Sequence, residues 1–209
     1  AGISDGQSIS EWKDLSGNNN SAYANNSNGT LTSNGINFDQ TNFFYVPYDN
    51  SLTFTAYSLF VVMKPDNSYA GVQGVIGRGP SWERNFNFWL IHNNKIHHKF
   101  HSNLATNDGF DSSSDILSTR TLNIVNLTNS GTEANTYVDG ENNASYSAHS
   151  SIFSNTNLIS IGRDLDKTNT TDFDSWSNFD GQIAEILIFN QNLSTIDRNK
   201  INYYLSKKW

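Results

Sequence analysis

Short candidate strands recur between turn signals along almost the whole chain, with no helical pattern in the interior. The predicted strands are Ser8–Lys13, Gly35–Asp39, Phe43–Pro47, Ser58–Lys64, Gly74–Gly79, Asn85–His92, Lys95–His101, Thr121–Thr128, Ala134–Asp139, Leu158–Gly162 and Gly181–Phe189. Two pairs that tolerate a positive φ, Asn93-Asn94 and Asp139-Gly140, suit two-residue hairpin turns. Many short strands joined by such turns predict an all-β fold, an antiparallel sandwich of two sheets.

The last 32 residues, 178–209, do not follow this pattern of short strands and turns. Ile183–Phe189 is apolar at nearly every position, which predicts a strand covered on both faces. Ser194 and Asp197 then form a capping-box-like helix start. We expect one C-terminal helix whose apolar stripe is Ile201, Tyr204 and Leu205.

The same segment carries a family resemblance. Its pattern is F-x-G-x-I-x-E, then an aromatic residue followed by Asn, then L-S-x-x-D-R-x-x-I and Y-L-x-x-K-W. The matching positions are Phe179, Gly181, Ile183, Glu185, Phe189, Asn190, Leu193, Ser194, Arg198, Ile201, Tyr204, Leu205, Lys208 and Trp209. This ending resembles that of laminin-G-like, concanavalin-A-like domains, which are common in bacterial surface proteins and phage virion proteins.

The resemblance extends over nearly the whole chain. The opening Ser8–Asn18 is similar to the family's W-x-D-x-S-G-N, Tyr57–Pro65 to its central strand, and Asn157–Asp164 to the strand before its last hairpin. The resemblance implies one concanavalin-A-like jelly-roll domain over residues 1–209 with a structural role for Glu185. It implies a ligand only loosely, because one fold hosts many functions.

Composition narrows the function classes. The chain has 209 residues, no Cys, and a formal net charge of −7 with 13 Lys and Arg in all. The charge and the scattered basic residues argue against nucleic-acid binding, and no apolar run is long enough to insert into a membrane. Without Cys, a domain exposed outside a cell has to rely on its core alone.

Catalytic signatures are missing from the sequence. The five Glu residues do not form the E-x-D-x-x-E cluster of the concanavalin-A-like hydrolases, and neither G-x-S-x-G nor H-E-x-x-H occurs. We therefore expect a protein that is not an enzyme.

Four of the five His lie in His92–His101. With a two-residue turn at Asn93-Asn94, Phe88 shares the exposed face with His97, Lys99 and His101; with a longer loop, Trp89 replaces Phe88. His97 and His101 would be about 13 Å apart along the strand, too far to share a metal ion. One interpretation of this face is an ordinary solvated strand pair, and the other is a sugar-binding surface, since aromatic rings and hydrogen-bonding groups are what sugars need.

Long polar loops are a second source of candidates. They are expected at Asn18–Ser33, Ser102–Ser118 and Asp164–Asn178, and loops of this length are often functional. Trp82 and Trp176 are the aromatic residues in predicted loops that would extend a sugar platform.

Calcium has two candidate sites. Asp164, Asp166 and Asp172 place carboxylates along one loop, although the Gly and terminal Glu of an EF-hand are missing. The second site follows from the resemblance, because laminin-G-like relatives often hold an ion where the termini meet, which implicates Asp14, Asn18 and Asp180. The alternative for both is that these side chains form Asx-turns in solvent.

These observations predict a non-enzymatic recognition or adhesion module that binds carbohydrate, extracellular and on a cell or virion surface. The expected partners are a glycan or polysaccharide, other virion or surface proteins, and further copies of the chain in a homo-oligomer. The main alternative is a structural virion decoration, fibre or assembly domain with protein–protein contacts. A weaker alternative is a polysaccharide-active enzyme.

Overall fold

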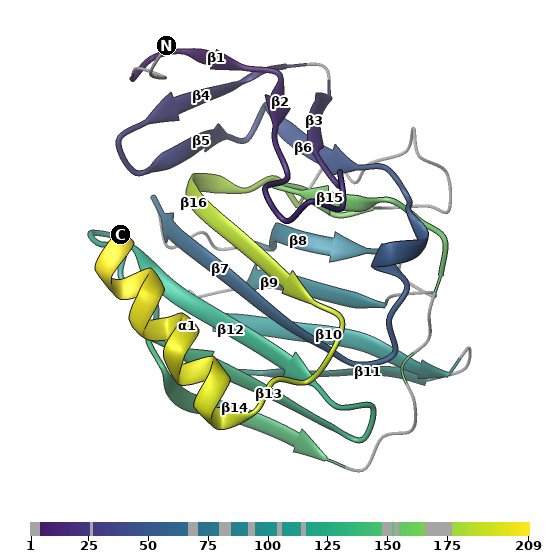
Figure 1. Cartoon of the computed structure of the whole chain (residues 1–209). Helices are drawn as coiled ribbons and strands as arrows, with labels where there is room; N and C mark the ends of the chain where they lie inside the picture. The colour runs from purple at the N-terminus through teal and green to yellow at the C-terminus, as the bar shows by residue number, and fades with distance from the viewer. Residues whose placement is uncertain are drawn as a thin grey trace.

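The fold is known from a computed structural model. It describes residues 5–25, 27–66, 71–79, 85–91, 95–103, 106–113, 116–147, 152, 155–165 and 177–209; for 91, 101–103 and 106–108 only the backbone is described. Two antiparallel sheets of eight strands and one C-terminal α-helix make up this part of the chain, which confirms the predicted sandwich (Figure 1).

Each sheet combines strands from distant parts of the sequence. Sheet A has the order β1 (Ser8–Ile9), β4 (Gly29–Thr32), β5 (Gly35–Asp39), β16 (Asp180–Phe189), β7 (Tyr57–Pro65), β12 (Asn123–Asn129), β13 (Glu133–Val138) and β14 (Glu141–Ser147). Sheet B has the order β11 (Thr106–Asp111), β10 (Lys95–Asn103), β9 (Phe86–Ile91), β8 (Gln73–Arg78), β15 (Ile159–Ile161), β6 (Phe43–Val46), β3 (Ala22–Asn25) and β2 (Glu11–Trp12).

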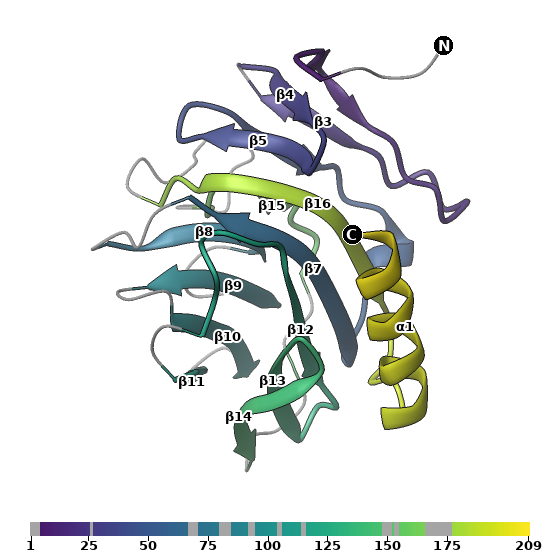
Figure 2. The ribbon, with the colours of Figure 1, turned by 90° about the vertical axis from the view of Figure 1, so that its left-hand side faces the viewer.

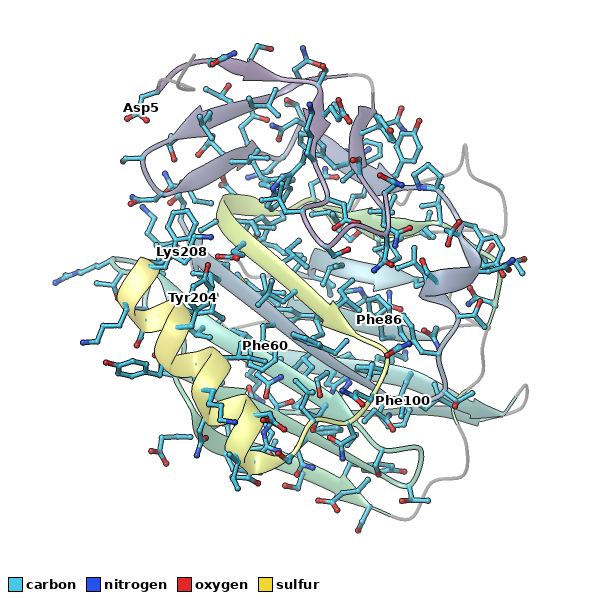
Figure 3. The ribbon with its side chains drawn as sticks, in the orientation of Figure 1. Asp5, Phe60, Phe86, Phe100, Tyr204 and Lys208 are labelled. Carbon is cyan, nitrogen blue, oxygen red and sulfur yellow. The ribbon has the colours of Figure 1, made fainter. Side chains whose placement is uncertain are left out.

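The main core lies between the sheets and is rich in aromatic rings. Phe38 packs edge-on against Phe44 and Phe179, at centroid distances of 5.9 and 5.8 Å. Such pairs add to the stabilisation that area burial alone gives. Phe86 and Phe100, labelled in Figure 3, belong to the same core and are almost completely buried.

Helix α1 (Thr195–Lys208) covers the outer face of sheet A, on the side away from sheet B (Figure 2). Its start agrees with the predicted cap: the Ser194 hydroxyl accepts a bond from the backbone N–H of Asp197 at 3.2 Å. Leu205 is fully buried against Phe60, and Ile201 packs against the same cluster, which confirms two members of the predicted stripe; Tyr204 is half exposed (Figure 3).

The predicted strand at 183–189 is covered on both faces, as expected, but its alternation is broken. A bulge at Ala184 shifts the register against β7. Ile183, before the bulge, faces the main core, and so do Ile186 and Ile188 after it; Leu187 and Phe189 face α1. The inserted residue therefore explains why Ile183 shares the core-facing side with Ile186 and Ile188, which have the opposite parity in the sequence.

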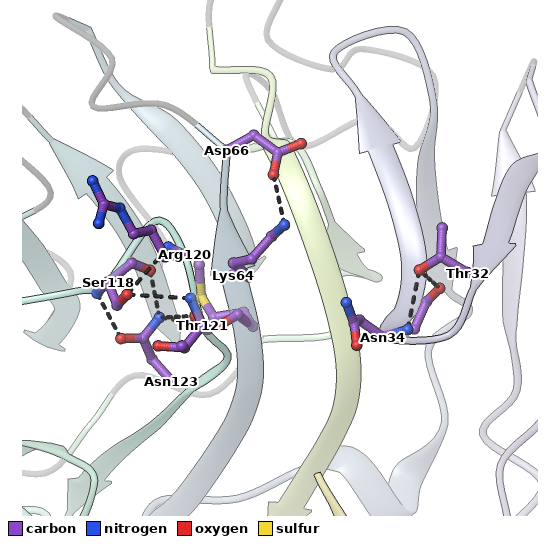
Figure 4. A network of polar contacts seen from close by, with 10 residues as sticks. Thr32, Asn34, Lys64, Asp66, Ser118, Arg120, Thr121 and Asn123 are labelled. Atoms are coloured by element: carbon purple, nitrogen blue, oxygen red, sulfur yellow. Dashed lines mark hydrogen bonds and ion pairs between the residues drawn. The ribbon is translucent and has the colours of Figure 1, made fainter.

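Polar side chains secure the connections between strands. Asn123 donates to the backbone oxygens of Met63, Ser118 and Thr121 and accepts from the Ser118 N–H, which holds the turn before β12 (Figure 4). Asp139 and Gly140 both have positive φ and join β13 to β14, so the predicted two-residue hairpin is confirmed.

A buried arginine, Arg78, links three backbone segments through hydrogen bonds. Arg78 is fully buried and donates to the backbone oxygens of Leu52, Asn155 and Asn157. Desolvation lowers the pKa of its guanidinium to about 10. The side chain thus attaches the short 3₁₀ helix η1 (Asn50–Leu52) to the segment before β15.

Two predictions of irregular structure were wrong: the expected loop at 18–33 contains β3 and β4, and the expected loop at 102–118 contains β11. The pattern of the sequence also gave no sign of β14. The expected loop at 164–178 falls mostly outside the described residues. Among the described helices, none has the length and apolarity to cross a membrane.

Candidate carbohydrate-binding surface

The register between β9 and β10 decides which side chains lie on the outer face of sheet B. Ile91 pairs with Lys95 and Trp89 pairs with His97, so three residues rather than two join the strands. Phe88 is consequently opposite His98 and fully buried in the main core, and the prediction that it lies on the exposed face is wrong. Trp89 takes its place, as expected for a longer loop.

Trp89, His97, Lys99 and Asp111 form what we call the outer-face cluster. The indole of Trp89 and the imidazole of His97 are stacked, with centroids 5.5 Å apart and planes inclined by 18°. The Lys99 ammonium lies 5.3 Å from the centre of the Trp89 ring. Trp89 is only 7% exposed, so it acts mainly as a support for the two side chains above it.

Asp111 fixes the orientation of His97 from the neighbouring strand. The two residues are paired between β10 and β11, and Nδ1 of His97 lies 2.5 Å from Oδ1 of Asp111. A carboxylate only accepts hydrogen bonds, so Nδ1 carries the proton. Nε2 is then an acceptor in the neutral ring and a donor in the protonated ring. The Asp111 side chain is 42% exposed.

The other face of β10 belongs to the core. His98 is fully buried, and its Nε2 lies 2.5 Å from the hydroxyl of Tyr57. Burial raises the pKa of Tyr57 far above its usual range, so the phenol stays neutral. His97 and His98 therefore point to opposite sides of the sheet, as the strand alternation predicts.

The remaining predicted ligand-binding side chains lie outside the described part of the structure. Trp82 and Trp176 lie outside the described residues, and only the backbone of His101 is described. Asp111 was not predicted because the segment that forms β11 is polar and was expected to be a loop. The available signal was the pair of Asp residues in that segment, which could have been matched to the outward-facing side chains of β10.

The calcium candidates lie in separate places. Asp164 is buried, and its Oδ1 accepts a bond from Nδ2 of Asn87 at 2.6 Å. Asp166 and Asp172 fall outside the described residues. Within the described part of the chain, no three His, Asp or Glu side chains are grouped to hold a metal ion.

The second candidate site is engaged in turns. Asp14 accepts bonds from the backbone N–H groups of Ser16 and Asn20, and the Asn18 N–H donates to the Ser16 hydroxyl. Asp180, at the start of β16, accepts a bond from Nε2 of Gln40 at 2.9 Å. The bond from the Ser16 N–H to Asp14 is an Asx-turn, the alternative given for this site, whereas Asp180 bonds to a side chain distant in the sequence. Calcium binding stays a prediction.

Glu185 has the scaffold position that the family resemblance implies. Its Oε2 accepts bonds from Nζ of Lys208 at 2.8 Å and Nε1 of Trp209 at 2.7 Å. The ammonium of Lys208 in turn has its pKa raised, first by its hydrogen bond to Glu185. The carboxylate therefore ties the end of α1 to β16.

Solved structures with the same fold include domains from toxins and sialidases. The binding domain of botulinum neurotoxin DC in complex with SialylT superposes with a TM-score of 0.73 at 14% identity, covering 95% of this chain and 51% of that one. A Ruminococcus gnavus IT-sialidase CBM40 bound to α2,3-sialyllactose superposes with a TM-score of 0.58 at 12% identity, covering 76% and 92%. A SAP-like pentraxin from Limulus polyphemus gives 0.55 at 13% identity, covering 77% and 81%.

At these identities the superpositions show a common fold. The chain spans about half the length of the neurotoxin chains that it matches. Among curated proteins, no relative matches its sequence. The family model described as "Concanavalin A-like lectin/glucanases superfamily" matches residues 38–197, and the two-sheet architecture agrees with it. The chain belongs to the concanavalin A-like lectin/glucanases superfamily.

Proposed function

We propose that this domain is a non-catalytic carbohydrate-recognition module and that it binds glycans at the outer-face cluster. The observation that carries the proposal is the grouping of Trp89, His97, Lys99 and Asp111 on one face of three adjacent strands. The ganglioside, SialylT and sialyllactose ligands named for solved structures of the same fold support a glycan as the ligand class.

The cluster offers both kinds of contact that a sugar requires. The half-buried His97 presents a planar ring to the apolar C–H groups of a pyranose, and Trp89 beneath keeps that plane in place. The Asp111 carboxylate accepts bonds from sugar hydroxyls, and the Lys99 ammonium donates to them. Trp89 is therefore a positioning residue, and His97, Lys99 and Asp111 make the contacts.

Each such site binds weakly on its own. A few hydrogen bonds and one small ring contribute a binding free energy only slightly larger than the entropic cost of ordering the sugar. Useful affinity therefore comes from several copies of the domain that bind at the same time. This requirement suits display on a cell or virion surface, where neighbouring domains contact one polysaccharide.

The decisive experiment is a glycan array probed with the domain displayed in multiple copies. We expect binding to a limited set of glycans, and about a tenfold weaker signal for His97→Ala and for Lys99→Ala. Lys200→Ala is the matched control, because Lys200 lies on α1, away from sheet B. Absence of binding to every glycan, or unchanged binding by both cluster variants, would overturn the proposal.

An EDTA arm of the same array tests calcium. A calcium ion held by the Asp164 loop or by Asp14, Asn18 and Asp180 would make both glycan binding and thermal stability sensitive to EDTA. If binding and melting temperature are unchanged in EDTA, the calcium proposal fails and the glycan proposal stands.

A further inference from the structure

The second half of β16 has a strand partner on one side only. On one edge, β7 pairs with β16 as far as Phe189. On the opposite edge, β5 pairs only with Asp180–Ile183. Among the described residues, no strand or backbone bond satisfies the edge of 184–189 that faces away from β7.

The backbone geometry explains why β5 stops there. Gly35, with φ of +114°, begins β5 so close to the bulge that an added Cβ would lie 2.3 Å from the Ile183 oxygen and 2.4 Å from Cα of Ala184. The chain turns away into β4 at this point. Residues 184–189 of β16 therefore have no neighbouring strand on the edge where β5 pairs with the first half of β16.

This unpaired edge borders a cleft of about 720 Å³. Ile186 and Ile188 of β16 form one wall, and Ile76, Ile159 and Ile161 of sheet B form the other. Leu15, which is 93% exposed, lies at the cleft in the loop between β2 and β3. The cleft thus combines apolar side-chain walls, polar side chains such as Asn18 and Asn20, and a row of backbone N–H and C=O groups.

We infer that this cleft binds an extended segment of a partner polypeptide, which adds a strand to sheet A beside residues 184–189. An edge with alternating donors and acceptors is satisfied by another extended backbone, and the apolar walls fit apolar side chains at every second position. Six residues in this conformation span about 20 Å.

Other occupants fit the cleft less well. An acyl chain would leave the edge of β16 without hydrogen-bond partners in an apolar surrounding, which is costly. A sugar would find partners in polar side chains that also line the cleft, such as Asn18, Asn20 and Ser51, but it lacks the regular row of donors and acceptors that the strand edge requires. The charges that line the cleft balance: the two positive side chains are Lys13 and Lys208, and the two negative ones are Asp14 and Glu185. Lys208 and Glu185 already form an ion pair with each other. An uncharged peptide is therefore favoured over an acidic or basic one.

A partner strand at this site would also explain why an unprotected strand edge, which would otherwise promote aggregation, is present in β16. Free strand edges are normally protected by charges, proline or very short length, because they recruit other chains. Within 184–189 there is no proline, and the one charged side chain, Glu185, is neutralised by its ion pair with Lys208. A specific partner strand would cover this edge and would give the domain protein–protein contacts in addition to glycan recognition.

Amide hydrogen exchange with a set of short peptides tests the inference. In the free protein we expect alternate amides in 184–189 to exchange quickly and the remainder, bonded to β7, slowly. Acetylated and amidated hexapeptides of alternating valine or isoleucine and threonine should slow the fast amides at least tenfold at saturation. The matched control is the same peptides with N-methyl groups on alternate amides, in both registers, which block strand pairing.

Two variants locate the binding. Leu15→Asp changes an exposed side chain and should weaken peptide binding about fivefold to tenfold without loss of folding. Ile188→Glu places a charge in the cleft wall and should abolish binding; if this variant does not fold, Leu15→Asp still decides. The inference is overturned if the N-methylated peptides bind equally well. It is also overturned if no peptide protects the fast amides at about 5 mM, a concentration that would largely fill a site with a Kd of about 1 mM. Binding of dodecanoate in the cleft, without binding of the peptides, would overturn it as well.

Discussion

The two outer faces of the sandwich are built in opposite ways. The outer face of sheet A carries an apolar patch beneath α1, where Phe60 and Val62 are buried. The outer face of sheet B holds His97, Lys99 and Asp111, polar side chains supported by one aromatic ring. The first face contributes to stability by excluding water, whereas the second keeps hydrogen-bonding groups at the surface.

This difference suggests a division of roles: the face under α1 stabilises the fold, and the outer face of sheet B is available for ligand recognition. A closed apolar face tolerates little change, because each side chain contributes through burial. A polar face on the opposite sheet can change its side chains with little effect on the core. Mutations on the two faces should therefore differ in what they affect.

The largest effect is expected under the helix. Leu205→Ala removes a fully buried side chain from the contact between α1 and sheet A and should lower the free energy of unfolding by about 3 kcal/mol. Urea denaturation followed by circular dichroism measures this. Tyr203→Ala, on the exposed side of the helix, should cost less than about 0.5 kcal/mol.

The same measurement on His97→Ala completes the comparison. Because His97 lies at the surface, we expect a loss of less than about 1 kcal/mol. If His97→Ala were as destabilising as Leu205→Ala, the outer-face cluster would be a structural feature and the contrast between the two faces would not hold.

An intermediate effect is expected where a loop crosses sheet B. A Cβ at Gly77 would lie 2.4 Å from Nδ2 of Asn87, whose amide donates to the buried Asp164. Gly77→Ala should displace Asn87, break this bond and lower the free energy of unfolding by about 2 kcal/mol. In an Asn87→Ala background the same change should cost little; an equal cost in both backgrounds would contradict the explanation.

The smallest effect concerns the first turn of α1 and its pH dependence. Hydrogen bonds from Ser194 and Lys200 hold the pKa of the Asp197 carboxyl below its ordinary value of 3.8. The carboxylate therefore stabilises the folded state above about pH 4, and this contribution is lost as the pH falls through the lowered pKa.

Hydrogen exchange of the first-turn amides between pH 5 and pH 2 checks this prediction. The protection of these amides should decrease more in the wild type than in Asp197→Asn, which lacks the titrating group. An identical pH profile in both proteins would show that the capping carboxylate does not contribute.

Much of the fold could be predicted from the pattern of the chain. The strands that face the core on one side, such as β5, β7 and β13, contain enough apolar residues to be recognised. β3, β4, β11 and β14 were missed because polar residues dominate them. β11 and β14 lie at sheet edges, where one neighbour is enough and little apolar surface is buried.

The candidate site could be predicted only in part. Alternation along β10 correctly separates His97 from His98, but the choice between Phe88 and Trp89 depends on one residue in a turn. Asn-Asn suits a two-residue turn, and nothing in the local sequence indicates the third residue. Asp111 reaches His97 through sheet pairing, which spacing along the chain does not reveal.

The bulge at Ala184 has a consequence for how this protein can change during evolution. Deleting this one residue would leave Glu185 on the helix side and Ile186 on the main-core side, because Glu185 already pairs with Val62 next to the Ile183–Met63 pair. Deleting Ile186 instead would turn Leu187 toward the main core and Ile188 toward the helix. Changes in the length of β16 should therefore be tolerated at the bulge and rejected in the residues that follow it.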